Sequence, residues 1–354
     1  MLDEFDTIVH FDLFEAPKAR LLIIYTGGTL GMDYDAGGTL VPCGFDSVLR
    51  RAPVIKELQI NLSVLSFKVP IDSSSVEIKH WQQMAEIIYN NYSDYDGFLI
   101  LHGTDTMAYS ASALSFMLQG LDKPVVFTGA QLPIASPRSD AKENLVTSLE
   151  IASDKKEGKP IITEVCIFFN NRLIRGNRAK KVESQQFDAF ESENYPILAQ
   201  AGITIDYQWS YLMPSANKDL VLTTKMNPSV IVLKLFPGLQ PATVDHIIKA
   251  PNIKGVILES YGAGNVPHQK WFLNLLEEGV KSDKIILNIS QCNGGKVMHG
   301  KYETSSKLDE IGVISGEDLT TEAATTKMMY ALGRYSNIKD IQNCLTTPIR
   351  GEMN

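Results

Sequence analysis

Two short glycine-led segments present hydroxyl groups in a setting where they could react. The segment TGGT ends in Thr29, and the segment HGTD carries Thr104 and Asp105. Glycine allows positive φ and close approach of the backbone, so such a turn can hold a hydroxyl beside converging N–H groups. Taken alone, each segment is better explained as a tight turn or a helix cap. A chemical role therefore depends on what other segments bring to the same place.

Two further segments supply small polar groups and a cation. Asp72-Ser73-Ser74-Ser75 precedes a predicted helix, and a cap accounts for only one of these four residues, so the surplus suggests hydrogen bonds to a substrate. The segment FFNNRLIRGNRAKKVES is ordinarily a solvated basic hairpin, but one of its lysines beside Asp105 would be able to accept a proton. An adjacent carboxylate raises the pKa of a lysine, so either burial must lower it or the lysine must act through a hydrogen-bonded chain.

These groups form a set for nucleophilic catalysis that lacks histidine, cysteine and metal. Threonine is a weak nucleophile that needs an adjacent base, and amide hydrolysis through an acyl-threonine intermediate fits the set better than dehydrogenase chemistry. His102 precedes the second glycine-led turn, where a lone histidine is more often a packing or hydrogen-bonding residue. The sequence thus predicts an enzyme with no cofactor and no metal.

The elements that must position these groups alternate between apolar strands and amphipathic helices. Unbroken apolar runs predict buried strands of a parallel sheet, and this alternation predicts an α/β fold. In such sheets, ligands bind where the strands end and loops lead into helices. The predicted strands are RLLIIY, YDGFLILHG, KPVVFTG, EVCIFFN, SVIVLKLFPG, IKGVILESYG and KIILNISQ, with helices in HWQQMAEIIYNNY, TMAYSASALSFMLQG, SDAKENLVTSLEIASD, ATVDHIIKA and HQKWFLNLLEEGV.

The length of 354 residues favours two domains. A polar, irregular stretch from about residue 201 predicts a linker between a larger N-terminal domain, with a mostly parallel sheet flanked by helices, and a smaller C-terminal α/β domain. We expect an N-terminal extension over 1–19, the catalytic domain over 20–205, the linker over 206–227 and the second domain over 228–354.

Composition excludes several classes of function. The net charge is -8, which argues against a nucleic-acid or anionic-membrane surface, and no apolar run approaches the length of a membrane span. The acidic N-terminus does not resemble a signal peptide. Four cysteines lie far apart and the six histidines lack ligand spacing, so neither a disulfide framework nor a zinc site is expected. These features predict an intracellular protein.

Several of these segments together resemble a known family. YTGGTLGM, DSS, YDGFLILHGTDTMAYSASALSFML, FFNNRLIRGNR and SYGAGN are similar to the bacterial type I, cytoplasmic L-asparaginases of the asparaginase/glutaminase family. The resemblance runs from about Arg20 to the C-terminus. It implies the two-domain α/β fold, hydrolysis of L-asparagine to aspartate and ammonia without a cofactor, and assembly as a homodimer or homotetramer.

The resemblance also implies roles for individual residues. Thr29 matches the nucleophile, while Thr104, Asp105 and Lys181 match the second catalytic group, with Thr104 also a candidate for positioning water. The register counted from RGNR selects Lys181 rather than its neighbour. The positions that hold the α-amino and α-carboxylate groups of the substrate are Asp72, Ser73 and Ser74, with help from Thr104 and Asp105.

One departure from the family concerns a catalytic tyrosine. Family members usually carry a tyrosine on the loop after the nucleophile, where this chain offers Thr39 or Leu40. Our hypothesis is that Tyr302 assists Thr29 in its place. Tyr25 and Tyr34 are weaker alternatives.

A second departure concerns regulation. Some type I enzymes bind a second asparagine beside an arginine that precedes SYG, where this chain has Glu259. An acid there should repel a carboxylate, so we expect no activation through that site although Cys292 is retained.

Three alternative functions remain to be weighed against the sequence. The preference between asparagine and glutamine stays open, because one methylene changes binding by only about 1–3 kcal/mol. The relative that feeds ammonia to a tRNA-bound amidation carries an additional N-terminal domain, and only about 20 residues precede the first predicted strand here. A non-catalytic binding module is the rival from another class, but Gly262-x-Gly264 lacks the third glycine of a dinucleotide fingerprint.

Overall fold

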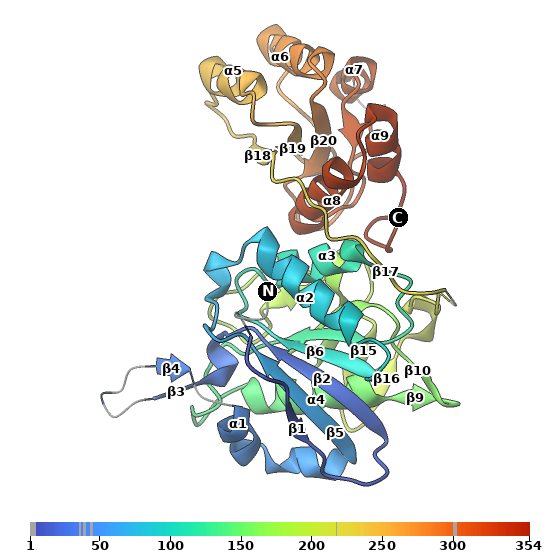
Figure 1. The fold of residues 1–354 in the computed structure, drawn as a ribbon. Coiled ribbons are helices and arrows are strands. Elements are labelled where there is room, and N and C mark those ends of the chain that lie inside the picture. Colours follow the sequence, from blue (N-terminus) through green and yellow to red (C-terminus); the bar gives the residue numbers. More distant parts are fainter. Residues whose placement is uncertain (1–4, 35–36, 38–39, 43–44, 217, 300–302) are drawn as a thin grey trace. The chain divides into compact units, whose positions relative to one another are not determined.

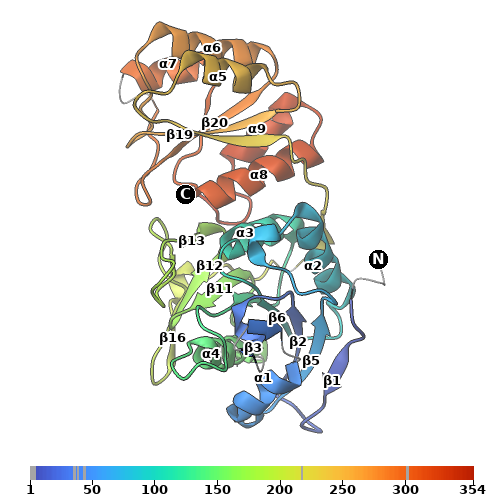
Figure 2. The same cartoon turned by 90° about the vertical axis from the view of Figure 1, so that its left-hand side faces the viewer.

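The chain folds into two compact units. The computed structural model describes residues 5–34, 37, 40–42, 45–216, 218–299 and 303–354. Unit 1 extends to Ser192 and includes Pro196–Leu222, and unit 2 consists of Glu193–Tyr195 and Thr223–Asn354. Each unit has its own sheet covered by helices (Figures 1 and 2), which confirms the predicted α/β class and the mostly parallel character of the larger sheet.

Unit 1 is built on a nine-stranded sheet. Its five central strands are parallel, and both sides are extended by antiparallel strands. The central strands are continuous apolar runs because both faces of the sheet are covered. In spatial order the strands are β1 (Val9–Phe11), β5 (Ile60–Ser66), β2 (Ala19–Tyr25), β6 (Gly97–Leu101), β8 (Val125–Thr128), β11 (Val165–Phe169), β12 (Arg172–Arg175), β15 (Ala199–Ala201) and β16 (Ile205–Tyr207).

Three main helices cover this sheet. Helices α2 (Ile78–Asn90) and α3 (Met107–Met117) pack against each other, and α4 (Ala141–Ser153) lies on the other face (Figure 2). Ten of the eleven residues of α3 are buried, and most are small, which lets neighbouring segments approach it closely. Shorter pieces complete the unit: α1 (Phe45–Arg51), β3 (Met32–Tyr34) with β4 (Leu40–Pro42), β7 (Leu118–Gln119) with β17 (Val221–Leu222), β9 (Lys155–Lys156) with β10 (Lys159–Pro160), and β13 (Lys180–Lys181) with β14 (Phe190–Glu191).

The N-terminal extension adds an edge strand to this sheet. β1 pairs antiparallel with β5, and Asp6 N–H donates to the carbonyl of Ser66 at 2.9 Å. The ring of Phe5 packs edge-on against Phe67, with 4.7 Å between the centroids. The extension therefore reinforces the strand that leads into the Asp72–Ser75 segment.

The predicted linker contains ordered edge structure. Residues 205–207 form β16 of the large sheet, and β17 pairs antiparallel with β7. The carbonyl of Met213 also accepts from the hydroxyl of Thr163 at 2.8 Å. Polar edge strands and turns share their composition with a linker, so the exact domain boundaries stay a prediction.

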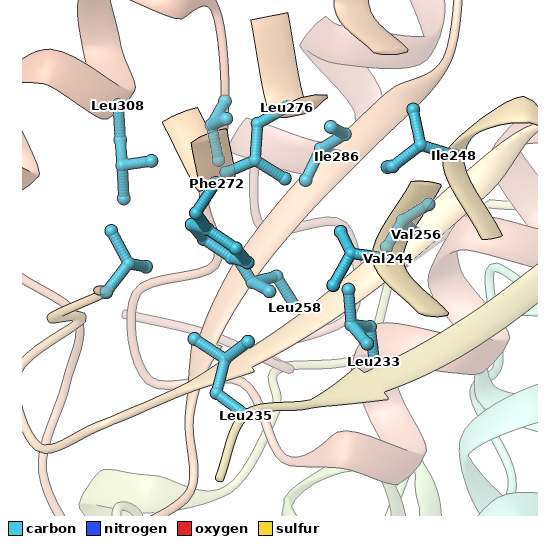
Figure 3. Close-up of a cluster of buried hydrophobic side chains, with 12 residues drawn as sticks. Leu233, Leu235, Val244, Ile248, Val256, Leu258, Phe272, Leu276, Ile286 and Leu308 are labelled. Atoms are coloured by element: carbon cyan, nitrogen blue, oxygen red, sulfur yellow. The ribbon is translucent and has the colours of Figure 1, made fainter. Parts of the chain in front are cut away.

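Unit 2 has a four-stranded parallel sheet with helices on both faces. The strands in order are β18 (Val230–Lys234), β19 (Gly255–Ser260), β20 (Ile285–Ser290) and β21 (Ile314–Ser315). Helices α5 (Pro241–Lys249), α6 (Lys270–Lys281) and α7 (Glu303–Ile311) cover one face, and α8 (Thr321–Arg334) and α9 (Ile338–Thr346) cover the other (Figure 1). Figure 3 shows the apolar core between the sheet and the first group, centred on Phe272 and Leu258.

Across the described residues, no helix is long and apolar enough to cross a membrane.

Candidate active site

The first candidate loop leaves the end of β2. Thr26 is buried, and its hydroxyl donates to the carbonyl of Leu101 at 2.9 Å, which fits the structural role expected for it. Gly27 and Gly28 follow with φ of 130° and 88°, a backbone conformation that favours glycine. Thr29 then begins a short 3₁₀ turn and is partly exposed. The loop thus keeps Thr26 inside and leaves Thr29 accessible.

The second loop leaves β6, the strand next to β2, and lies directly against the first. A Cβ added to Gly28 would stand 2.6 Å from the backbone nitrogen of Gly103, so only glycine permits this approach. Thr104 and Asp105 follow Gly103, and the side chain of Asp105 is 62% exposed. The parallel register of β2 and β6 therefore brings the Thr29 loop and the Thr104 loop together.

The lysine arrives from a more distant part of the chain. After β12, a 3₁₀ turn over Gly176–Arg178 crosses α3, and β13 follows it beside that helix (Figure 2). A Cβ on Gly176 would lie 2.9 Å from that of Ala111, and Asn177 Nδ2 donates to Ser115 Oγ at 3.1 Å. The small residues of α3 are what permit this crossing.

Lys181 forms hydrogen bonds with both Thr104 and Asp105. Its Nζ donates to Thr104 Oγ1 at 2.8 Å and to Asp105 Oδ1 at 2.7 Å. The lysine side chain is 18% exposed. The contact with Thr104 is within the reach needed for direct proton transfer.

Gln131, which the sequence analysis did not select, completes the contacts of Thr104. The Thr104 hydroxyl donates to Gln131 Oε1 at 3.3 Å, and Gln131 Nε2 donates to the carbonyl of Gln186 at 3.0 Å. The carboxylate of Asp140 accepts from the Gln131 N–H and holds this turn. Gln131 follows β8, whose end adjoins that of β6, and the only available signal was this strand-end position.

The Asp72–Ser75 segment adjoins the same two loops. The Asp72 carboxylate accepts from Ser74 N–H at 3.0 Å and caps the 3₁₀ turn, so one of the four residues is the expected cap. Ser73 is buried, and its Oγ accepts from Asp105 N–H at 3.3 Å. Asp72 and Ser74 remain exposed and available to a ligand.

His102 lies behind these loops, away from solvent. Its Nδ1 is 2.7 Å from the carbonyl oxygen of Gly103, and its Nε2 is 2.9 Å from Ser110 Oγ. Burial lowers the pKa of His102 from 6.5 to about 4, so the ring is neutral at physiological pH. This agrees with the expected hydrogen-bonding role.

Most residues considered for the role of the assisting tyrosine lie outside the described part of the chain. Tyr302 and Thr39 lie outside the described residues, and the side chain of Tyr34 does as well. Tyr25 is buried, and its hydroxyl donates to the carbonyl of Gly31 at 3.0 Å. The identity of an assisting tyrosine therefore stays a prediction.

In unit 2, Glu259 has partners of its own. Its carboxylate accepts from the hydroxyl of Thr321 at 2.6 Å and lies 3.4 Å from Lys234 Nζ. The side chain of Glu259 is only 10% exposed, so burial and these two partners restrict its movement.

Comparison with known proteins gives consistent matches over nearly the whole chain. The family described as "Asparaginase, N-terminal" matches residues 20–213, and "Glutaminase/Asparaginase C-terminal domain" matches residues 229–345. L-asparaginase 1 of Escherichia coli is 39% identical over 95% of this chain and 98% of its own length. The 60 kDa lysophospholipase of Mus musculus is also 39% identical, over 95% of this chain and 63% of its own. The crystal structure of L-asparaginase I from Vibrio cholerae superimposes with a TM-score of 0.86 and 36% identity, over 96% of this chain and all of that one.

Proposed function

The chain belongs to the asparaginase/glutaminase family, among its type I members, and from this premise we propose that it hydrolyses L-asparagine to L-aspartate and ammonia. The observation that carries the proposal is the pair of contacts made by Lys181, to Thr104 at 2.8 Å and to Asp105 at 2.7 Å. A hydroxyl that accepts a hydrogen bond from a lysine, where the same lysine also contacts a carboxylate and a second hydroxyl loop lies alongside, suits activated-nucleophile chemistry.

The proposed reaction has two covalent steps. As the proton of the Thr29 hydroxyl passes through the neighbouring catalytic groups to the leaving nitrogen, the Thr29 oxygen attacks the carbon of the side-chain amide, an ester bond forms, and the C–N bond breaks to release ammonia. Water positioned by Thr104 then attacks the ester, which releases aspartate and returns the proton to Thr29. In this second step, neutral Lys181 accepts a proton from the attacking water through the Thr104 hydroxyl, and charged Lys181 returns that proton to the Thr29 oxygen.

The substrate is oriented by groups around the two loops. The carboxylates of Asp72 and Asp105 suit the α-ammonium group, and Ser73 and Ser74 suit the α-carboxylate, with Thr104 also in reach of the ligand. Asp105 and Asp72 are both solvent-accessible, as a ligand-binding role requires. We further propose that Tyr302 assists Thr29, in which case Tyr302→Phe should lower turnover, and full turnover would refute this assignment.

The proposal extends to the compartment and the assembly of the enzyme. We propose a cytoplasmic homodimer or homotetramer that requires no cofactor, with no nucleic-acid or membrane partner. The described cysteines Cys166, Cys292 and Cys344 are free thiols, which suits a reducing compartment.

A direct test compares ammonia release by wild type, Thr29→Ala and Lys181→Met on asparagine and on glutamine. Both variants should lose about three or more orders of magnitude in kcat with the fold intact. Lys180→Met is the matched control because Lys180 is the adjacent lysine of the same short strand, and it should keep near-normal turnover. Wild-type protein that binds a nucleotide but releases no ammonia would instead favour the binding module.

A further inference from the structure

Three buried side chains form a hydrogen-bonded chain that ends on the backbone of the candidate site. Trp81 Nε1 is 2.9 Å from Ser110 Oγ, which is 2.9 Å from His102 Nε2, and His102 Nδ1 is 2.7 Å from the carbonyl oxygen of Gly103. The three residues are 7%, 0% and 2% exposed and come from α2, α3 and the end of β6. His102 is thus too deeply buried to act as a general base on a ligand at the surface of the site.

The chemistry of the groups fixes the direction of every bond in this chain. The indole N–H of Trp81 can only donate and the carbonyl of Gly103 can only accept. His102 must therefore carry its proton on Nδ1, and because burial lowers its pKa to about 4 it carries only that one. Its Nε2 then accepts from the hydroxyl of Ser110, which in turn accepts from Trp81. One tautomer of His102 satisfies all three contacts.

Gly103, the residue held by this chain, is wedged between the other two loops. A Cβ on Gly103 would stand 2.6 Å from Ser73 Oγ, and a Cβ on Gly28 would stand 2.6 Å from the Gly103 nitrogen. Gly28 directly precedes Thr29, and Gly103 directly precedes Thr104. A rotation of the Gly103–Thr104 peptide would therefore shift both hydroxyls relative to each other.

We propose that His102 is a positioning residue. Through its Nδ1–H it fixes the peptide between Gly103 and Thr104, and it thereby sets the position of the Thr104 hydroxyl relative to the Thr29 hydroxyl. Trp81 and Ser110 hold the imidazole in the required tautomer. This inference rests on the proposed function, and it assigns His102 an effect on turnover without contact to the substrate.

Two substitutions of His102 separate positioning from simple packing. In His102→Asn the amide nitrogen replaces Nδ1 and still reaches the Gly103 carbonyl, whereas in His102→Gln the amide extends toward Ser110 and the donor to Gly103 is lost. We expect the Asn variant to keep kcat within about threefold, and the Gln variant to lose about 10–100-fold in kcat with little change in KM. Equal kcat losses in both variants at comparable thermal stability would overturn the proposal.

A second measurement on wild-type protein tests the inference even if the variants fold poorly or asparagine is not the substrate. Nitrogen-15 NMR of labelled wild-type protein, with the His102 ring signals assigned through bonds from its sequentially assigned backbone, should show a neutral ring protonated on Nδ1 near pH 7. A ring protonated on Nε2 would overturn the proposal. Absence of ammonia release with the Nδ1 tautomer present would count against the proposed function alone.

Discussion

At the scale of single residues, the candidate site depends on contacts between segments that lie far apart in the chain. Lys181 was separated from Thr104 by the whole of α3, β8, α4 and β11, yet the two are 2.8 Å apart. Family resemblance selected this lysine, because no local pattern distinguishes it from Lys180. Gln131 was missed because its contact with Thr104 depends on the order of strands in the sheet and not on any motif near it.

The buried ring of His102 should make stability depend on pH. In the unfolded chain this imidazole takes up a proton as the pH falls below about 6.5, while the folded protein keeps it neutral down to about pH 4. The stabilisation is therefore complete above pH 6.5 and is lost as the pH falls toward 4. The unfolding free energy should therefore fall by about 2 kcal/mol between pH 7 and pH 5 because of this one residue.

Denaturant unfolding of wild type and His102→Asn at these two pH values measures this effect. The Asn variant should lack this part of the pH dependence. Identical pH dependence in the two proteins would contradict this prediction, because it would mean that His102 takes up its proton over the same pH range in the folded and the unfolded protein.

At the scale of elements, strands with unbroken apolar runs were predictable and elements with buried polar residues were not. β5 escaped prediction because Asn61 and Ser63 interrupt its apolar residues, although both are buried. α8 was missed for a similar reason, since it buries the polar residues Thr326 and Lys327. Periodicity finds apolar faces, and polar groups satisfied by tertiary partners leave no such signal.

The crossing of Gly176 over α3 should control the position of Lys181. Because an added Cβ would lie 2.9 Å from that of Ala111, Gly176→Ala should push the turn away from α3 and draw Lys181 Nζ from Thr104. We expect kcat for ammonia release to fall about tenfold or more. Gly202→Ala is the control, because its nearest neighbouring atom would be 3.8 Å away. Unchanged turnover in Gly176→Ala would mean that β13 is held independently of this contact.

A buried ion pair anchors the last residues of unit 2. Lys327 Nζ lies 2.6 Å from Glu352 Oε1, both side chains are fully buried, and the lysine also donates to the carbonyls of Leu345 and Thr347. Glu352→Gln leaves the ammonium buried without a counter-charge and should cost about 3–5 kcal/mol of unfolding free energy.

Denaturant unfolding of the variants tests this account of the ion pair. Lys327→Met added to Glu352→Gln should restore part of the loss, while Asp245→Asn, which breaks the exposed pair with Lys249, should have little effect. A Glu352→Gln protein as stable as wild type would contradict the account.

At the scale of the whole molecule, length and composition predicted two domains, and the chain does form two compact units. The exact boundaries could not be read from the sequence because edge strands such as β16 and β17 are short and polar. Every described residue that we propose to act on asparagine lies in unit 1. Glu259 lies in unit 2. Because of this residue we predicted that a second asparagine does not activate the enzyme.

The acid at Glu259 should leave the enzyme without activation by a second asparagine. Its carboxylate is fixed by Thr321 and repels another carboxylate, so the initial rate should rise hyperbolically with asparagine concentration. A sigmoidal curve that disappears when residues around Glu259 and Cys292 are substituted would refute this prediction.

We propose above all that Thr29 carries the acyl group during amide hydrolysis. The most direct measurement is acid quenching of the enzyme during turnover of asparagine, followed by peptide mass spectrometry, in wild type and in Thr104→Val, where slower deacylation should let the intermediate accumulate. We predict an aspartyl ester on the peptide that contains Thr29 and none in Thr29→Ala. An ester on Thr104 instead, or full turnover by Thr29→Ala, would contradict the account.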